Sequence, residues 1–200
     1  MELTNVFGEL VERLRQKKPV VHAITNYVTA ESCADVALAA GASPVMADEP
    51  EEVEEITAGA DALVLNLGTI SFNKQIAMER AVAVAKRKGI PVVLDPVGVM
   101  ASKMRLNFAL QLLNKGYIDI VRGNFSECNA LLTGSTGGHG VDNLEGDTEE
   151  GVALKVAKEA AKKFNCVFAL TGAIDNISNG KQAVVLNNGH PLLQDITGSG

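Results

Sequence analysis

The 200-residue sequence contains no tryptophan, and only 4% of its residues are aromatic. Single-stranded nucleic acids are bound largely by stacking bases on aromatic side chains, which this chain can hardly provide. Basic residues are also in deficit, since 18 Lys and Arg against 24 Asp and Glu give a formal net charge of −6. Phosphate contacts need a positively charged face, so we expect no nucleic-acid partner.

The three cysteines, Cys33, Cys128 and Cys166, are far apart and form no CxxC pair. We therefore expect neither a disulfide framework nor a zinc site, and this use of cysteine is consistent with a reducing compartment. No apolar run is long enough to span a bilayer. Residues 1–19 form an amphipathic segment and do not resemble a signal peptide. We therefore expect a cytoplasmic protein without a membrane partner.

Several common catalytic and binding motifs are missing. The sequence has no GxxxxGK[ST] phosphate loop, no GxGxxG after its first predicted strand and no GxSxG nucleophile elbow. The histidines His22, His139 and His190 lack the spacing of metal ligands. His22 falls within a predicted strand, where we interpret it as a hydrogen-bonded structural residue.

Short apolar runs alternate with longer helical segments along the chain. The runs predict strands at 19–24, 43–47, 62–68, 91–97, 118–123 and 166–172. The segments between them predict helices at 30–41, 50–59, 71–89, 102–116, 124–134 and 148–164. The strands are apolar without polar alternation, which is typical of strands covered on both faces. This order predicts an α/β fold with a mostly parallel central sheet and helices on both sides.

Two later segments depart from this pattern. Asn179-Gly180 lies between two β-like runs and predicts an antiparallel hairpin with a tight primed turn. Residues 134–147 are polar and rich in glycine, which predicts a mobile surface loop. No linker divides the chain, so residues 1–200 are expected to form a single domain.

Ligands of open parallel sheets bind at the carboxyl ends of the strands, and these ends are unusually polar here. One of them carries Asp95, which can hold a metal ion or cap an Asx-type turn. The next carries Arg122, Asn124 and Glu127; the last two form a capping-box-like pattern. Arg122 needs an anionic partner and could bind a nucleotide phosphate, while Glu127 could help to hold Mg²⁺.

The sequence ends in "QDITGSG", in which Thr197, Gly198 and Gly200 follow an Asp-Ile pair. A glycine turn that leads into a helix presents backbone N–H groups and the positive end of the helix dipole to an anion. We interpret this turn as an anion hole for phosphoryl transfer, with a flexible glycine-rich terminus as the alternative. The helix that should follow is missing, so we expect the domain to lack its C-terminal helices.

The ordered motifs resemble those of hydroxyethylthiazole kinases, which belong to the ribokinase-like superfamily and act in thiamine biosynthesis. The segments that carry the resemblance are "VHAITNYVT", "GASPVMA", "LNLGT", "VLDPVGV", "RGNFSE", "GVD", "LTG" and "DITGSG". The resemblance implies a ribokinase-like three-layer α/β/α sandwich. It also implies ATP-dependent phosphorylation of the hydroxyl group of 4-methyl-5-(2-hydroxyethyl)thiazole, with Mg²⁺, by a homotrimer with active sites at its subunit interfaces.

The same resemblance implies roles for individual residues. Substrate-binding positions are Asn26, Met46, Gly68 and Gly198; ATP-binding positions are Arg122, Asn124 and Thr171; Asp95 and Glu127 organise the metal; and Thr197, Gly198 and Gly200 form the anion hole. The general base of the family lies beyond Gly200. Two other functions stay open: an ATP- or ADP-dependent NAD(P)H-hydrate dehydratase on the same scaffold, and a non-catalytic thiazole- or nucleotide-binding protein.

Overall fold

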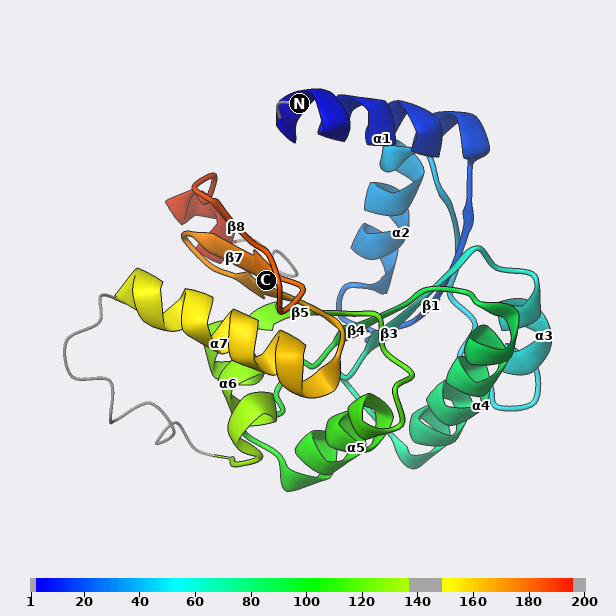
Figure 1. Ribbon diagram of the computed structural model, residues 1–200. Coiled ribbons are helices and arrows are strands. Elements are labelled where there is room, and N and C mark those ends of the chain that lie inside the picture. Colours follow the sequence, from blue (N-terminus) through cyan, green and yellow to red (C-terminus); the bar gives the residue numbers. More distant parts are fainter. Residues whose placement is uncertain (1–2, 137–148, 196–200) are drawn as a thin grey trace.

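An eight-stranded sheet forms the centre of the computed structural model, which describes residues 3–136 and 149–195 (Figure 1). The elements follow one another in the order α1 (Leu3–Lys17), β1 (Val20–Ile24), α2 (Ala30–Ala40), β2 (Ser43–Val45), α3 (Val53–Ala58), β3 (Ala62–Asn66), α4 (Phe72–Lys88), β4 (Val92–Asp95), α5 (Lys103–Asn114), β5 (Ile120–Asn124), α6 (Phe125–Thr133), α7 (Glu149–Phe164), β6 (Val167–Thr171), β7 (Asp175–Ser178), β8 (Ala183–Leu186) and the 3₁₀ helix η1 (Pro191–Asp195).

The strands lie in the order β2-β1-β3-β4-β5-β6-β7-β8. Every pair from β2 to β6 is parallel, and the last two pairs, β6 with β7 and β7 with β8, are antiparallel. The predicted mostly parallel sheet with a late antiparallel hairpin is therefore confirmed. Parallel neighbours place all their carboxyl ends at one edge of the sheet, which is where the polar strand ends gather.

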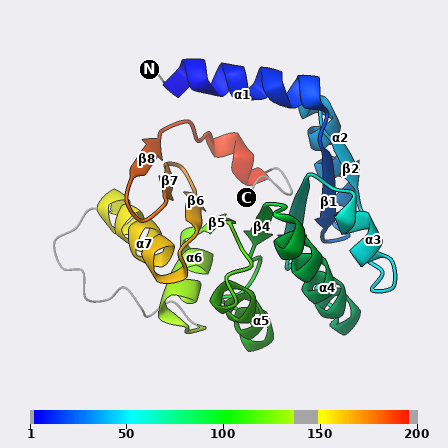
Figure 2. The same ribbon diagram turned by 45° about the vertical axis from the view of Figure 1, so that its right-hand side comes forward.

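Helices lie on both sides of the sheet. Figures 1 and 2 show α3 to α7 along one side, while α1 and α2 lie on the other, near β1 and β2. Several helix ends follow from local sequence. The Ser71 hydroxyl accepts a hydrogen bond from Lys74 N and caps the start of α4, and Gly89 ends that helix with a left-handed φ of +69°.

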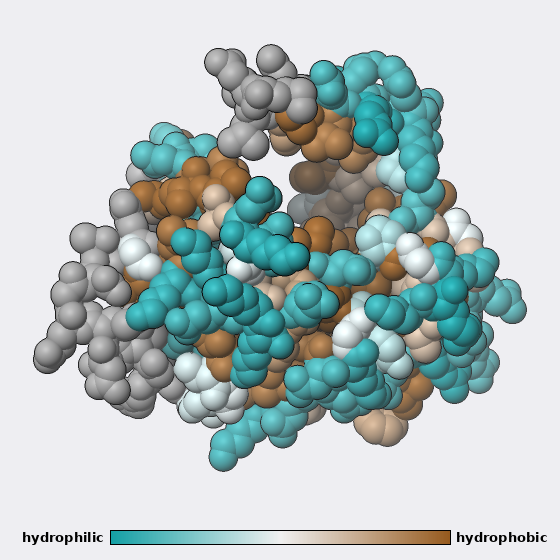
Figure 3. Space-filling view, viewed as in Figure 1, coloured by the Kyte–Doolittle hydropathy of each residue, from teal (hydrophilic) through white to brown (hydrophobic). Residues whose placement is uncertain are grey.

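The two faces of the sheet differ in burial. On the face toward α4 to α7, alternate strand residues are fully covered; they include Leu63, Leu65, Leu94, Val121 and Phe168, each 0% exposed. The opposite face carries half-buried apolar residues, among them Val64, Val93, Ile120 and Ala169. Within the described residues, α1 and α2 cover this second face only at its β1–β2 end. Figure 3 shows a hollow beside α1 whose wall is largely apolar.

The hairpin turn lies one residue later than the Asn-Gly pair suggested. Asn179 N donates to Gln182 O at 3.2 Å, so Gly180 and Lys181 are the central residues. Gly180 supplies the positive φ of +82° that a primed turn needs at its first central position. The Asn179 side chain instead accepts from the backbone N–H groups of Lys181 and Gln182.

Some of the features predicted from the sequence lie outside the described residues. The predicted loop at 134–147 is described only to residue 136, and His139 lies beyond that limit. Within the residues that the structure does describe, we found no helix with the length and apolar character needed to cross a membrane.

Because the two faces differ in burial, we expect the same Val→Ala change to lower the free energy of unfolding by different amounts at two adjacent residues of β4. Val92 is 1% exposed on the covered face, and Val93 is half-buried on the other. We expect Val92→Ala to lower the free energy of unfolding by about 2 kcal/mol, and Val93→Ala by less than half of that. Chemical denaturation of both variants measures the difference. Equal losses would contradict the asymmetry.

Candidate active site

Four neighbouring strands each end in a polar residue at the same edge of the sheet. Asn66, Asp95, Asn124 and Thr171 are the last residues of β3, β4, β5 and β6. Asn66 pairs with Asp95, and Asn124 pairs with Thr171. Because the register between β4 and β5 matches Leu94 with Val121, Asp95 comes level with Arg122. The structure thus brings together the residues assigned to nucleotide and metal on one rim.

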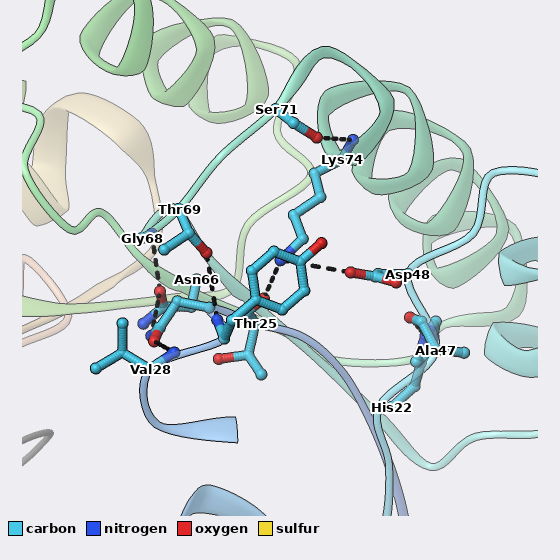
Figure 4. Close-up of polar contacts among 12 residues, drawn as sticks. His22, Thr25, Val28, Ala47, Asp48, Asn66, Gly68, Thr69, Ser71 and Lys74 are labelled. Carbon is cyan, nitrogen blue, oxygen red and sulfur yellow. Dashed lines mark hydrogen bonds and ion pairs between the residues drawn. The ribbon is translucent and has the colours of Figure 1, made fainter. Parts of the chain in front are cut away.

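The side chain of Asn66 connects the middle of this rim to the loop after β1. Its Nδ2 donates to Asp95 Oδ2 at 2.7 Å. Its Oδ1 accepts from Asn26 Nδ2 at 3.1 Å and from Gly68 N at 2.9 Å (Figure 4). Asn66 is only 8% exposed. A row of amides therefore links the predicted acceptor-binding residue Asn26 to the predicted metal-binding residue Asp95.

Gly68 allows this close packing. A Cβ atom at Gly68 would lie 2.9 Å from both Asn26 Cβ and Asn66 Oδ1. Real Cβ atoms essentially never approach so closely, so any larger residue must displace one of the two asparagines. The glycine that the resemblance assigned beside the substrate also has this structural reason to be a glycine.

Asn26 also organises the start of α2. Its Oδ1 accepts hydrogen bonds from Val28 N, Thr29 N and Thr29 Oγ1 at 3.0, 3.0 and 3.1 Å. These bonds form an Asx-type turn that orders the chain just before the helix. One amide hydrogen on Nδ2 goes to Asn66, which leaves the second as a donor for a ligand.

The backbone after β2 is fixed from beneath by His22. Its Nε2 lies 2.8 Å from Ala47 O, and its Nδ1 lies 2.8 Å from Thr57 Oγ1. A carbonyl oxygen only accepts, so Nε2 carries the proton and the Thr57 hydroxyl donates to Nδ1. Burial lowers the pKa of His22 and keeps it neutral. His22 is thus a structural residue, as predicted, and it holds the segment that contains Met46.

Asp95 has an unfavourable position for an ionised carboxylate. Burial, together with the nearby charge of Glu127, raises its pKa from 3.8 to about 6; Arg122 and the Asn66 hydrogen bond offset only part of this. Two carboxylates held close together in a partly desolvated site favour a bound cation. The influence of Arg122 on Asp95 also identifies an anionic neighbour for this arginine within the chain.

Glu127 has a clear structural role. Its Oε2 accepts from Asn124 N at 3.0 Å, and Asn124 Oδ1 accepts from Glu127 N at 2.9 Å, which completes the predicted capping box of α6. Its Oε1 accepts from Gly98 N at 3.1 Å, so Glu127 also holds the loop after β4 against α6. Each carboxylate oxygen keeps lone pairs for a metal-bound water.

The described side chains do not form a complete metal cage. Within residues 3–136 and 149–195, no group of three His, Cys, Asp or Glu side chains could hold a metal ion. Asp95 and Glu127 fit a Mg²⁺ ion that takes its remaining ligands from water and substrate phosphates. Thr197, Gly198 and Gly200 lie outside the described residues, so the anion hole stays a prediction.

Two buried polar residues near this rim, Asn66 and Lys74, received no role from the sequence. Asn66 belongs to the polar strand ends and follows an apolar strand in the same way as Asp95, but its position alone does not show which partners it bonds. Lys74 lies three residues after the N-cap Ser71, where a lysine ordinarily points to solvent; nothing in the sequence indicates its burial.

Comparison with known proteins extends over nearly the whole chain. Residues 11–200 match the model of the hydroxyethylthiazole kinase family. A protein named hydroxyethylthiazole kinase from Ruminiclostridium cellulolyticum is 44% identical over 199 residues, which cover 100% of this chain and 73% of that protein. Its namesake from Pyrococcus horikoshii is 44% identical over 192 residues, covering 96% of this chain and 71% of that protein.

Solved structures agree with this result. The structure of the hydroxyethylthiazole kinase protein from Pyrococcus horikoshii OT3 superposes with a TM-score of 0.88 at 40% identity, covering 97% of this chain and 71% of that one. A phosphomethylpyrimidine kinase from Clostridium difficile reaches a TM-score of 0.59 at 11% identity, with 85% of this chain and 84% of that chain covered. That more distant likeness concerns the fold alone and confirms the expected α/β/α architecture.

Because the Asp95 carboxylate is unfavourably placed, we expect that removing its charge stabilises the fold. Asp95→Asn keeps the size of the side chain and an oxygen that can accept from Asn66, but it removes the buried charge. We expect it to raise the free energy of unfolding at pH 7.5 by roughly 1 to 3 kcal/mol. Because the folded pKa is raised, this advantage is complete above pH 6 and disappears as the pH falls toward 3.8. Denaturation curves at several pH values measure it.

Asp61→Asn provides the matched control. The pKa of Asp61 is lowered chiefly by Lys17, whose Nζ lies 2.8 Å from its Oδ1. Neutralising this carboxylate should destabilise the fold slightly or leave it unchanged. An Asp95→Asn protein that is less stable than the parent at pH 7.5 would contradict the description of the rim.

Proposed function

This chain belongs to the hydroxyethylthiazole kinase family, and from that premise we propose that it phosphorylates 4-methyl-5-(2-hydroxyethyl)thiazole. The γ-phosphoryl group of ATP is transferred to the hydroxyl group of the thiazole side chain, which gives the thiazole phosphate and ADP for thiamine biosynthesis. The chain spans 71–73% of the length of the relatives described above.

The observation that carries the proposal is the Asn26–Asn66–Asp95 row of hydrogen bonds. It joins the loop assigned to the acceptor with the strand end assigned to the metal, through contacts of 3.1 and 2.7 Å. Phosphoryl transfer depends mainly on positioning and electrostatic stabilisation, with little covalent chemistry for the protein. A rigid connection between the two half-sites is what such a reaction requires.

Each residue has a proposed part in the reaction. Asn26, Met46 and Gly68 bind the thiazole, with Met46 acting through its backbone. Arg122, Asn124 and Thr171 bind ATP, and Arg122 is suited to this because its guanidinium can donate two hydrogen bonds to a phosphate. Asp95 and Glu127 would hold Mg²⁺, which when bound neutralises charge on the transferring phosphoryl group.

The transfer itself is an in-line displacement. The acceptor hydroxyl oxygen forms a bond to the γ-phosphorus while the bond from that phosphorus to the β–γ bridging oxygen breaks, and ADP leaves. The hydroxyl proton passes to a general base that we assign to a position after Gly200. Thr197, Gly198 and Gly200 are proposed to donate backbone N–H groups to the equatorial oxygens.

We also propose a cytoplasmic homotrimer with active sites at its interfaces. Tyr27 and Val28, the two residues after Asn26, are 73% and 70% exposed. Large apolar side chains so close to the acceptor loop suit contact with a second subunit. Cys33, Cys128 and Cys166 are free thiols, which suits a reducing cytoplasm. Sedimentation analysis of the complete protein tests the trimer.

The assay of the complete protein uses the thiazole alcohol, ATP and Mg²⁺, with ADP and the thiazole phosphate quantified by mass spectrometry. We expect equal amounts of both products. In a parallel reaction, dehydration of hydrated NADH in place of thiazole phosphorylation would support the dehydratase alternative. Binding of thiazole without product would support the non-catalytic alternative. Either outcome would contradict a thiazole kinase.

Gly68→Ala tests the acceptor half of the site. The added methyl group would lie 2.9 Å from both Asn26 Cβ and Asn66 Oδ1, so one of these two asparagines must shift. We expect KM for the thiazole to rise by about tenfold or more, and KM for ATP to stay within about twofold. An unchanged thiazole KM in a folded protein would remove Gly68 and Asn26 from the acceptor site.

Gly198→Val tests the anion hole. A side chain in the glycine turn would block the close approach of the backbone to the phosphoryl group. We expect turnover to fall by about 10²–10³-fold or more, with a melting temperature close to that of the parent protein. Full activity of this variant would contradict the proposed role of the turn.

A further inference from the structure

Lys74 is among the largest fully buried side chains of the described residues, although it carries a charge. It lies in the first turn of α4 and is 2% exposed. A buried ammonium group is costly unless charged and polar partners surround it. The partners of Lys74 therefore indicate why a lysine occupies this position.

Three groups surround the ammonium. Nζ donates to Thr25 O at 2.6 Å and lies 3.4 Å from Asp48 Oδ2. It also lies 3.7 Å from the centroid of the Tyr27 ring, within the range of a cation–π contact. Figure 4 shows the side chain reaching from α4 to Thr25 and Asp48, which come from different loops. Lys74 thus ties the loop after β1 and the loop after β2 to one helix.

The anchored residues flank the positions assigned to the acceptor. Thr25 and Tyr27 are the immediate neighbours of Asn26, and Asp48 follows Met46 by two residues. His22 holds the intervening Ala47 carbonyl from the core side. His22 therefore holds the segment that contains Met46, whereas Lys74 holds both acceptor segments from the side of α4.

We propose that Lys74 is a positioning residue for the acceptor: its ammonium, through Thr25, Asp48 and Tyr27, holds Asn26 and Met46 in one binding pocket. The inference rests on the proposed thiazole kinase function and adds a residue that does not itself contact the substrate. A single neutral group could satisfy one of the three partners, whereas an ammonium offers three donors and a charge.

Other lysines on α4 form a useful contrast. Lys86 Nζ donates to Gly116 O at 3.0 Å, but it does so from an exposed position at the far end of the helix. Lys86 therefore shares the helix, the residue type and the kind of bond with Lys74, and it lacks contact with the acceptor loops. Lys86→Met is the matched control for Lys74→Met.

The test measures steady-state kinetics of the complete protein with the thiazole alcohol and Mg²⁺-ATP. We expect Lys74→Met to raise KM for the thiazole by about tenfold or more, while KM for ATP at saturating thiazole changes by less than about twofold. Lys86→Met should leave both constants unchanged. A residue with a merely structural role would lower the apparent kcat in proportion to the lost folded protein and would leave both KM values unchanged.

A second variant keeps the inference testable if Lys74→Met does not fold. Asp48→Asn changes a half-exposed carboxylate and should raise the thiazole KM in the same selective way, by a smaller factor. The double variant should be no worse than Lys74→Met alone, because both changes act through one contact. Strictly multiplicative effects would overturn the proposed connection.

The outcomes separate this inference from the proposed function. If the parent protein makes no thiazole phosphate, the proposed function fails. If the parent protein turns over but Lys74→Met and Asp48→Asn keep the parental thiazole KM, Lys74 has no positioning role. Selective loss of thiazole binding in both variants supports it.

Discussion

The side-chain amide of Asn66 is the interaction on which the candidate site depends. It donates to Asp95 and accepts from Asn26 and Gly68, so it joins three chain segments at the carboxyl edge of the sheet. The parallel register puts Asn66 beside Asp95, and the absence of a side chain at Gly68 lets the two asparagines meet. The proposed acceptor and nucleotide halves are thereby fixed relative to one another.

The site also contains charge that the fold stabilises only in part. Glu127 uses both carboxylate oxygens to hold the loop after β4 and the start of α6, which places its charge near Asp95. Arg122 relieves some of the repulsion and Asn66 some of the desolvation. Protein stability is given up here at a site that we propose to bind a cation and phosphates, a compromise typical of active sites.

Much of this arrangement could be predicted from the sequence, because strand ends, caps and turns depend on local residue patterns. Asp95, Arg122 and Asn124 follow apolar runs directly, and the Asn124–Glu127 spacing predicts a capping box that the structure contains. Lys74 could not be predicted, since its burial arises from two loops that meet it only in three dimensions. The glycine turn at 197–200 remains a prediction.

Replacing Asn66 with leucine tests the central claim most directly, since leucine has a similar shape and cannot form the three hydrogen bonds. The measurement is thiazole phosphate formation by the complete protein at saturating ATP and Mg²⁺, with the folded fraction determined by circular dichroism. We expect turnover per folded molecule to fall by about 10²-fold, because the reacting groups lose their alignment. Turnover equal to that of the parent protein would show that the two halves of the site do not depend on Asn66.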